Sequence, residues 1–301
     1  MIVAVALALA CGMSYGVSDF FGGVSSARVR VAPTSFLTYG LATVVAAAAL
    51  LVAGGRWSGS ALAWAVLAGL FAVSGTLAFY AALVAGPMSL VTPIVGTIES
   101  AVPVIAAVLI GQRMTALTWL AIVLAIAGGA LVSLKIGAGE RLTARPALLA
   151  VAGGLLFGGS IIALNRAPRD SGLIPAVFEG GVGFVIMAAL LAWARASTRV
   201  SRLLRLFDGG ADAAPAAAAP GRSGIRSYAA GIASGVLLGA SNTLLVLALR
   251  AGPLAVVSVL ADLYPVAAVL LAWLVLRERL SAVQVSGVAL AVGASALFAL
   301  A

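Results

Sequence analysis

The sequence predicts an all-α polytopic membrane protein with ten transmembrane helices, arranged as two inverted five-helix repeats. Three observations lead to this fold class. First, 63% of the 301 residues are hydrophobic, only 9% are charged, and the mean hydropathy is +1.19. Second, the apolar runs are continuous and reach about 20 residues, the length that crosses the hydrocarbon core of a bilayer. Third, the two halves of the chain resemble each other in sequence.

Backbone polar groups in lipid must be satisfied within the protein, so only helices or a closed barrel can span a membrane. Continuous rather than alternating apolar runs favour helices. We expect ten spans, at residues 3–24, 34–53, 61–84, 87–109, 115–135, 146–165, 173–193, 228–249, 253–275 and 282–300. Such a chain belongs in the cell membrane as a multi-pass protein.

One connection, residues 194–227, is much longer than the others. Its second half is an Ala/Pro/Gly linker that we expect to be flexible. In its first half, four arginines spaced for one helical face predict a short amphipathic helix on an anionic membrane surface, with membrane lipids as its partner. A solvated basic turn is the alternative. These arginines are Arg195, Arg199, Arg202 and Arg205.

An internal repeat divides the chain into two predicted domains, 1–137 and 146–301, the second including the basic and flexible loop 194–227. Residues 85–115 align without gaps to 251–281 at an offset of 166 positions. A second, shorter sequence match pairs residues 11–18 with 153–160, so that Gly12, Gly16 and Ser18 align with Gly154, Gly158 and Ser160. Five spans per repeat insert the halves in opposite directions, which is a plan of secondary transporters with a binding site at the repeat interface.

Two stretches of the chain resemble the EamA domain of the drug/metabolite transporter superfamily: "AGP…P…LLAWLVLRERLS…GVALAVGASAL" in the second half and "YGVSDFFGG" in the first span. The resemblance covers essentially the whole chain as two tandem domains. It implies ten helices and export of small metabolites, but no particular substrate. The first repeat departs from the pattern, because Glu99 stands where the alignment places Pro265, and Gln112 stands where it places Glu278.

Two acidic residues lie deep within apolar spans. Glu99 is near the middle of the fourth span and Asp262 near the middle of the ninth, and no basic residue is equally deep. The repeat maps Asp262 onto Gly96, one helical turn from Glu99. A charge at this depth is costly, so we expect one or both acids to be protonated, or a cation to visit them. The alternative is a neutral acid that bonds to a neighbouring helix.

Other residues complete the predicted lining of a substrate or ion site. Polar side chains at depth are Tyr15, Ser18, Thr76, Tyr80, Asn242 and Tyr264. Helix packing is an alternative role for each of them. Asp19 and Glu179 lie nearer the ends of their spans, where a charge at the membrane interface costs little, so their role stays open. Pro93, Pro103 and Pro265 are expected to bend the helices that carry Glu99 and Asp262.

We expect a secondary transporter that exports small metabolites or cationic drugs, with Glu99 and Asp262 as candidates for proton coupling. The alternatives are a metabolite or amino-acid exporter without carboxylate coupling, an intramembrane enzyme, and a membrane scaffold. The chain has no His and one cysteine, Cys11, so we expect no metal, cofactor or catalytic residue, and no enzymatic activity. The partners expected are a small-molecule substrate, protons and lipids, without nucleic acid.

The charge distribution between loops bears on orientation. Loops on the side of the N-terminus hold five of the eighteen basic residues, namely Arg56, Arg113, Arg166, Arg169 and Arg250. The positive-inside rule then favours an outside N-terminus. The family resemblance instead implies cytoplasmic termini. Orientation, substrate, coupling ion, direction and oligomeric state stay open at this point.

Overall fold

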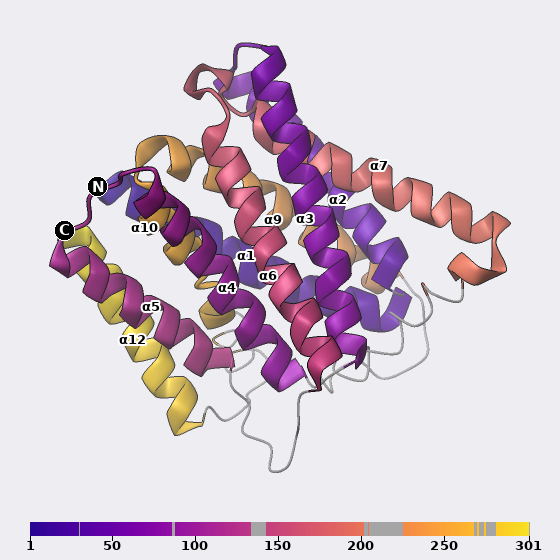
Figure 1. Cartoon of the computed structure of the whole chain (residues 1–301). Helices are drawn as coiled ribbons and strands as arrows, with labels where there is room; N and C mark the ends of the chain where they lie inside the picture. The colour runs from indigo at the N-terminus through magenta and orange to yellow at the C-terminus, as the bar shows by residue number, and fades with distance from the viewer. Residues whose placement is uncertain are drawn as a thin grey trace.

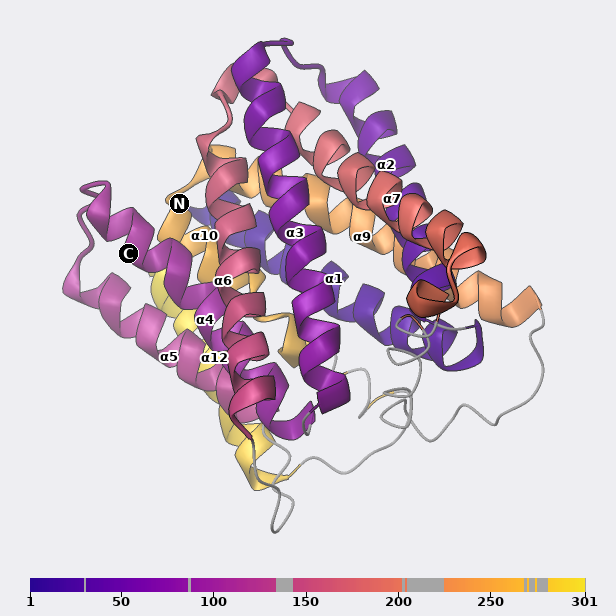
Figure 2. The same ribbon diagram turned by 45° about the vertical axis from the view of Figure 1, so that its right-hand side comes forward.

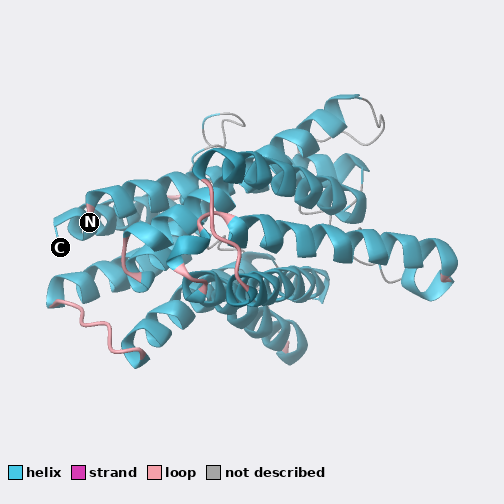
Figure 3. Ribbon diagram, turned by 90° about the horizontal axis from the view of Figure 1, so that it is seen from above, coloured by secondary structure: helices cyan, strands magenta, loops and turns pink. Residues whose placement is uncertain are grey.

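The computed structural model describes residues 1–29, 31–85, 88–133, 143–201, 204, 225–267, 270, 274 and 281–300. These residues form helices joined by loops, with no strand among them (Figure 3). The first half of the chain supplies α1 (Ile2–Val29), α2 (Val31–Ala53), α3 (Gly59–Ala85), α4 (Met88–Leu109) and α5 (Ala116–Ser133). The second half supplies α6 (Ala144–Arg166), the 3₁₀ helix η1 (Arg169–Ser171), α7 (Ile174–Ala196), α9 (Ile225–Ala251), α10 (Leu254–Ala261) and α12 (Ala282–Leu300).

Eight of the described helices are long and apolar enough to cross a membrane, and two shorter apolar stretches, 116–132 and 254–267, stand at the fifth and ninth predicted spans. The prediction of an all-helical, multi-pass membrane protein is therefore confirmed. The ninth span differs from the prediction of a bent helix over 253–275. Instead, α10 ends at Ala261, a turn follows at 262–263, and residues 264–267 are helical again.

The predicted basic amphipathic helix is described only at its start. Helix α7 ends at Ala196, and residues 198–201 are helical again after Ser197. Arg202, Arg205 and most of the linker after them lie outside the described residues. The membrane-surface role of this segment therefore stays a prediction.

Pairs of helices from opposite halves of the chain lie side by side. Helix α1 packs along α9, α3 along α6, and α5 along α12, as Figures 1 and 2 show for the last two pairs. Small residues allow the backbones to approach closely. Where α5 crosses α12, a Cβ atom added to Gly128 would lie 2.8 Å from the carbonyl oxygen of Gly287, and the reverse contact has the same distance.

Several inter-helix contacts recur in pairs that follow the sequence repeat. A Cβ atom added to Gly12 would lie 2.8 Å from the Ala261 carbonyl oxygen, and one added to Gly154 would lie 2.8 Å from that of Val95. Gly12 aligns with Gly154 in the shorter sequence match, and Val95 aligns with Ala261 at the offset of 166.

A pair of hydrogen bonds repeats the same relation. The Ser18 hydroxyl lies 2.8 Å from the carbonyl oxygen of Ser234, and the Ser160 hydroxyl lies 2.9 Å from that of Ala68. Ala68 and Ser234 are again 166 positions apart. The sequence repeat therefore coincides with matched packing contacts between helices of the two halves.

One end of the bundle holds both chain termini and the loops 54–58, 110–115, 167–173 and 252–253, and is called here the termini end (Figure 1). Polar contacts tie its loops together. The Arg250 side chain donates to the Ala167 carbonyl at 2.6 Å and to the Ser171 hydroxyl at 3.2 Å, and the Arg56 amide donates to the Asp170 carbonyl at 2.8 Å.

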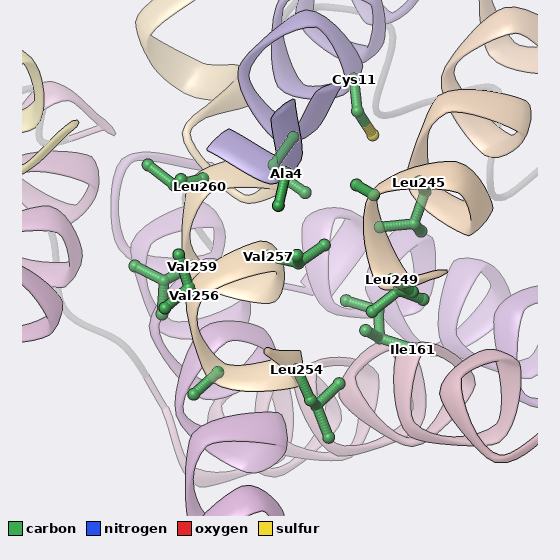
Figure 4. Packing of buried hydrophobic residues seen from close by; sticks show 14 of the residues in the cluster. Ala4, Cys11, Ile161, Leu245, Leu249, Leu254, Val256, Val257, Val259 and Leu260 are labelled. Atoms are coloured by element: carbon green, nitrogen blue, oxygen red, sulfur yellow. The ribbon is translucent and has the colours of Figure 1, made fainter. Parts of the chain in front are cut away.

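The main hydrophobic core lies toward the termini end and surrounds α10. All eight residues of α10 are buried. Figure 4 shows its side chains extending in opposite directions, with Val257 toward Leu245 and Leu249, and Val256 and Val259 away from them. A helix that is apolar and buried all round needs partners on every side. Helices α1, α4, α5, α6 and α9 all contact it.

Candidate functional site

The candidate site begins at the break in the ninth span. Proline lacks the amide proton that continues a helix, so Pro265 leaves the Ala261 carbonyl without its usual donor. The chain turns there: the Asp262 amide donates to the Ser258 carbonyl at 3.0 Å, and the Leu263 amide donates to the Leu260 carbonyl at 3.3 Å. Asp262 therefore sits at a helix end inside the protein, where it is 8% exposed.

Helix α4 supplies a direct partner for this carboxylate. The Ser100 hydroxyl donates to Asp262 Oδ2 at 2.8 Å. Beside this bond, a cavity of about 20 Å³ lies between α4, α5 and the break after α10. Its polar lining consists of Thr92, Thr97, Ser100 and Asp262. A cavity of this size holds about one water molecule.

Two further features mark this cavity as polar and incompletely filled. The Thr92 hydroxyl oxygen is buried and has no hydrogen-bond partner among the described residues. A Cβ atom added to Gly96 would meet nothing within 4 Å. Gly96 is the repeat equivalent of Asp262, so the first repeat presents open space where the second presents a carboxylate.

Glu99 lies midway along α4, between the two prolines Pro93 and Pro103. Its side chain is half-buried and makes no hydrogen bond to a described residue. Its carboxylate interacts electrostatically with Asp262 and with Asp19. The two acids predicted to form the site are therefore brought into one electrostatic environment.

Asp19 joins this group from α1. Its side chain is exposed. The phenol of Tyr264 interacts electrostatically with Asp19, Glu99 and Asp262, which relates Asp19 to the other two acids. Asp19 thus connects the acidic group with the exposed surface toward the end of the bundle opposite the termini end. On the same side, an apolar groove of about 370 Å³ runs between α1 and α9, lined by Phe20, Phe21, Val24, Ala229, Ala230 and Ala233.

Several predicted lining residues contact each other rather than an open cavity. The Tyr15 hydroxyl on α1 donates to the side-chain carbonyl of Asn242 on α9. Ser18 contacts Ser234, as described above, and the Thr76 hydroxyl lies 3.1 Å from that of Tyr39. The Tyr80 side chain lies outside the described residues.

Glu179 is contributed by α7, and its described hydrogen bond is to α6 rather than to another acid. It is only 6% exposed, with Ser160 as its one described hydrogen-bond partner at 3.1 Å. Ser100, Thr92 and Ser160 were not proposed as site residues from sequence, because isolated hydroxyls in apolar helices are common. The available signals were that Ser100 directly follows Glu99 and that Ser160 repeats Ser18.

Comparison with protein families gives a match over nearly the whole chain. The family described as EamA-like transporters matches residues 2–134 and again residues 144–300. The chain belongs to the EamA-like transporter family. The predicted resemblance is therefore confirmed.

Comparison with solved structures gives a fold match for this EamA-like transporter. One crystal structure, described only as that of a protein, superposes with a TM-score of 0.74 at 18% sequence identity, covering 99% of this chain and 96% of the other. This similarity concerns the fold alone. None of the curated proteins compared matches the chain.

The candidate site of this EamA-like transporter thus combines a helix break, a hydroxyl donor and acidic groups from α1, α4 and the turn after α10. Family membership supports a small-molecule substrate and a lipid environment. Discontinuous helices near the membrane centre place backbone and side-chain ligands for substrates or ions in other secondary transporters.

Proposed function

We propose that this protein exports small cationic compounds across the cell membrane by alternating access, in exchange for protons. The observation that carries the proposal is the electrostatic interaction of Glu99 with Asp262, and Asp262 also borders a helix break and a small cavity. No described basic side chain forms an ion pair with either carboxylate.

Charge balance explains why a cation and a proton would compete at this site. Two neighbouring carboxylates in a low-dielectric interior repel each other, and an unpaired buried charge is costly. Either a proton or a positively charged substrate group supplies the missing charge. Binding of one therefore favours release of the other, which is the requirement for antiport.

The paired contacts of the two halves support alternating access. Gly12 packs against the carbonyl freed by Pro265, and Gly154 packs against its repeat equivalent on α4. If the two five-helix domains are inverted repeats, each half can adopt the packing of the other without new types of contact. Rocking of one repeat against the other around a central site then exposes it to each side in turn.

A pair of probes that differ in charge tests the substrate class. Benzylamine is a cation at neutral pH, and benzyl alcohol is a neutral compound of similar shape. We expect benzylamine, but not benzyl alcohol, to raise the thermal stability of the detergent-purified protein, because a bound ligand stabilises the folded state by mass action. In proteoliposomes we expect an imposed proton gradient to drive benzylamine accumulation.

Neutral replacements of the two acids locate the effect. Glu99→Gln and Asp262→Asn are expected to abolish both the stabilisation and the accumulation. Asp170→Asn is the matched control, because it removes a carboxylate from an exposed loop at the termini end. Equal responses to the amine and the alcohol, unchanged in both site variants, would contradict the proposal and favour a carrier without charge selection.

A further inference from the structure

Glu179 lies in the part of α7 nearer the termini end. It lies five residues after the start of α7, which is about 8 Å along the helix axis from that end. Three other helices enclose it closely. A Cβ atom added to Gly69 on α3 would lie 2.9 Å from the Glu179 carbonyl oxygen, and Gly180 packs on Thr43 of α2. Ser160 approaches from α6.

The hydrogen bonds of Ser160 are compatible with a protonated Glu179 in this conformation. The Ser160 oxygen lies 2.9 Å from the Ala68 carbonyl oxygen and 3.1 Å from Glu179 Oε1. A serine hydroxyl has one proton to donate, and a backbone carbonyl can only accept. If Ser160 donates to Ala68, a protonated Glu179 makes the second bond by donating to the serine oxygen; if Ser160 instead donates to Glu179 Oε1, an ionised carboxylate can accept that bond.

The surroundings of Glu179 agree with a neutral carboxylic acid. Its second oxygen, Oε2, is buried and has no hydrogen-bond partner among the described residues. The titratable groups that interact with it electrostatically are Cys11 and Tyr15 on α1 and Tyr39 on α2. None of them is a cation, and the described parts of α3, α6 and α9 place no charged side chain beside it. An ionised Glu179 would therefore be a buried charge without compensation.

We propose that Glu179 is a proton-binding site separate from Glu99 and Asp262, and that its protonation holds the termini end closed. This inference rests on the proposed transport function, because it assigns a second proton to the same cycle. Protonated Glu179 joins α7 to α6 and, through Ser160, to α3. Loss of its proton leaves a buried carboxylate whose one described donor is Ser160 and whose Oε2 has none, so the carboxylate requires water. Ionisation is therefore linked to separation of these helices and to entry of water from the termini end.

The chain contains its own reporter for this opening. Cys11 is the single cysteine, it is fully buried, and it belongs to the core cluster toward the termini end (Figure 4). Opening of that end exposes it. A membrane-impermeant maleimide added to proteoliposomes measures its exposure as a labelling rate, and this measurement needs no transport substrate.

The comparison is between the wild type and Glu179→Gln. Glutamine has the same shape, donates to Ser160, and cannot ionise, so the variant is expected to stay closed. Both proteins share the pH dependence of the thiol itself. We therefore expect the ratio of wild-type to variant labelling rates to rise several-fold from acidic to alkaline pH. A ratio that is constant with pH would overturn the proposal.

Infrared spectroscopy provides a second test that does not depend on labelling. The carbonyl stretch of a protonated carboxylic acid is resolved from that of a carboxylate. Because protonated Glu99 and Asp262 absorb in the same region, the signal of Glu179 is the difference between the wild type and Glu179→Gln. We expect this difference band at neutral pH, and a shift of its frequency in Ser160→Ala, where the hydrogen-bond partner of Glu179 is removed. A band unchanged in these variants, or insensitive to pH, would contradict a proton-binding role. Failure of benzylamine transport would refute only the proposed substrate class, since neither measurement uses a substrate.

Discussion

The close approach of α1 to the broken ninth span gives a prediction whose magnitude follows from the structure. An alanine at position 12 places its Cβ atom 2.8 Å from the Ala261 carbonyl oxygen and 3.0 Å from that of Leu260. Both neighbours are backbone atoms, so rotation of a side chain cannot relieve the overlap. Overpacking of this kind costs about 1–3 kcal/mol. Gly96→Ala is the matched control, because its Cβ atom meets nothing within 4 Å.

Each substitution also gains about 0.5–1 kcal/mol from the higher helix propensity of alanine, and this term cancels in the comparison. Gly12→Ala is therefore expected to be about 1–3 kcal/mol less stable than Gly96→Ala. The thermal midpoint of detergent-purified protein, followed by size-exclusion chromatography after heating, checks the difference. At roughly 2–4 °C per kcal/mol, it is measurable. Equal midpoints would refute the inference that the backbones of α1 and the ninth span are in contact.

Three further predictions follow from the polar contacts. Ser100→Ala leaves Asp262 without its described donor and is expected to lower the unfolding free energy by about 1–3 kcal/mol, measured by chemical denaturation; an unchanged value would contradict the bond. Tyr15→Phe and Asn242→Ala are each expected to destabilise the protein by about 1 kcal/mol, and their double variant should show non-additive losses in a double-mutant cycle. Arg250→Gln removes a charged link between loops of the termini end and is expected to accelerate maleimide labelling of Cys11; an unchanged rate would argue against a restraining role.

Much of the fold could be predicted because apolar length decides which segments cross a membrane. The ten predicted spans coincide with described helices within a few residues, except for the ninth. There Pro265 suggested a bend within one helix, whereas α10 ends at Ala261. The sequence shows where a backbone bond is missing, but the extent of unwinding depends on partners such as Gly12, which belong to a distant segment.

The candidate site could be predicted only in part. A charged residue within an apolar run can be recognised from the sequence of that run alone, so Glu99 and Asp262 could be identified. The hydroxyl partners did not, because Ser100 becomes informative only when tertiary packing brings it to Asp262. For Glu179, too, the position in the sequence alone did not show how deeply the side chain is buried. Its distance from the span end left a place at the interface open, but neighbouring helices pack closely at Gly69 and Gly180 and leave Glu179 only 6% exposed.

The two halves share contacts but differ in burial at three matched positions of α10 and α4. Val256, Ser258 and Leu260 on α10 are buried near the termini end. Their repeat equivalents on α4, at positions 90, 92 and 94, are partly exposed toward the other end. Exchange of these two environments would bury the first turns of α4 and open α10. Packing contacts match Glu179 to Thr38 on α2, because Gly69 packs on the Glu179 carbonyl and Gly235, 166 positions later, packs on that of Thr38. The matched glycine–carbonyl contacts persist under that exchange, whereas the bond between Ser160 and Glu179 has no acidic equivalent on α2. Under the proposed alternating access, the difference between the halves that depends on a protonatable side chain is therefore the bond between Ser160 and Glu179, which lies toward the termini end.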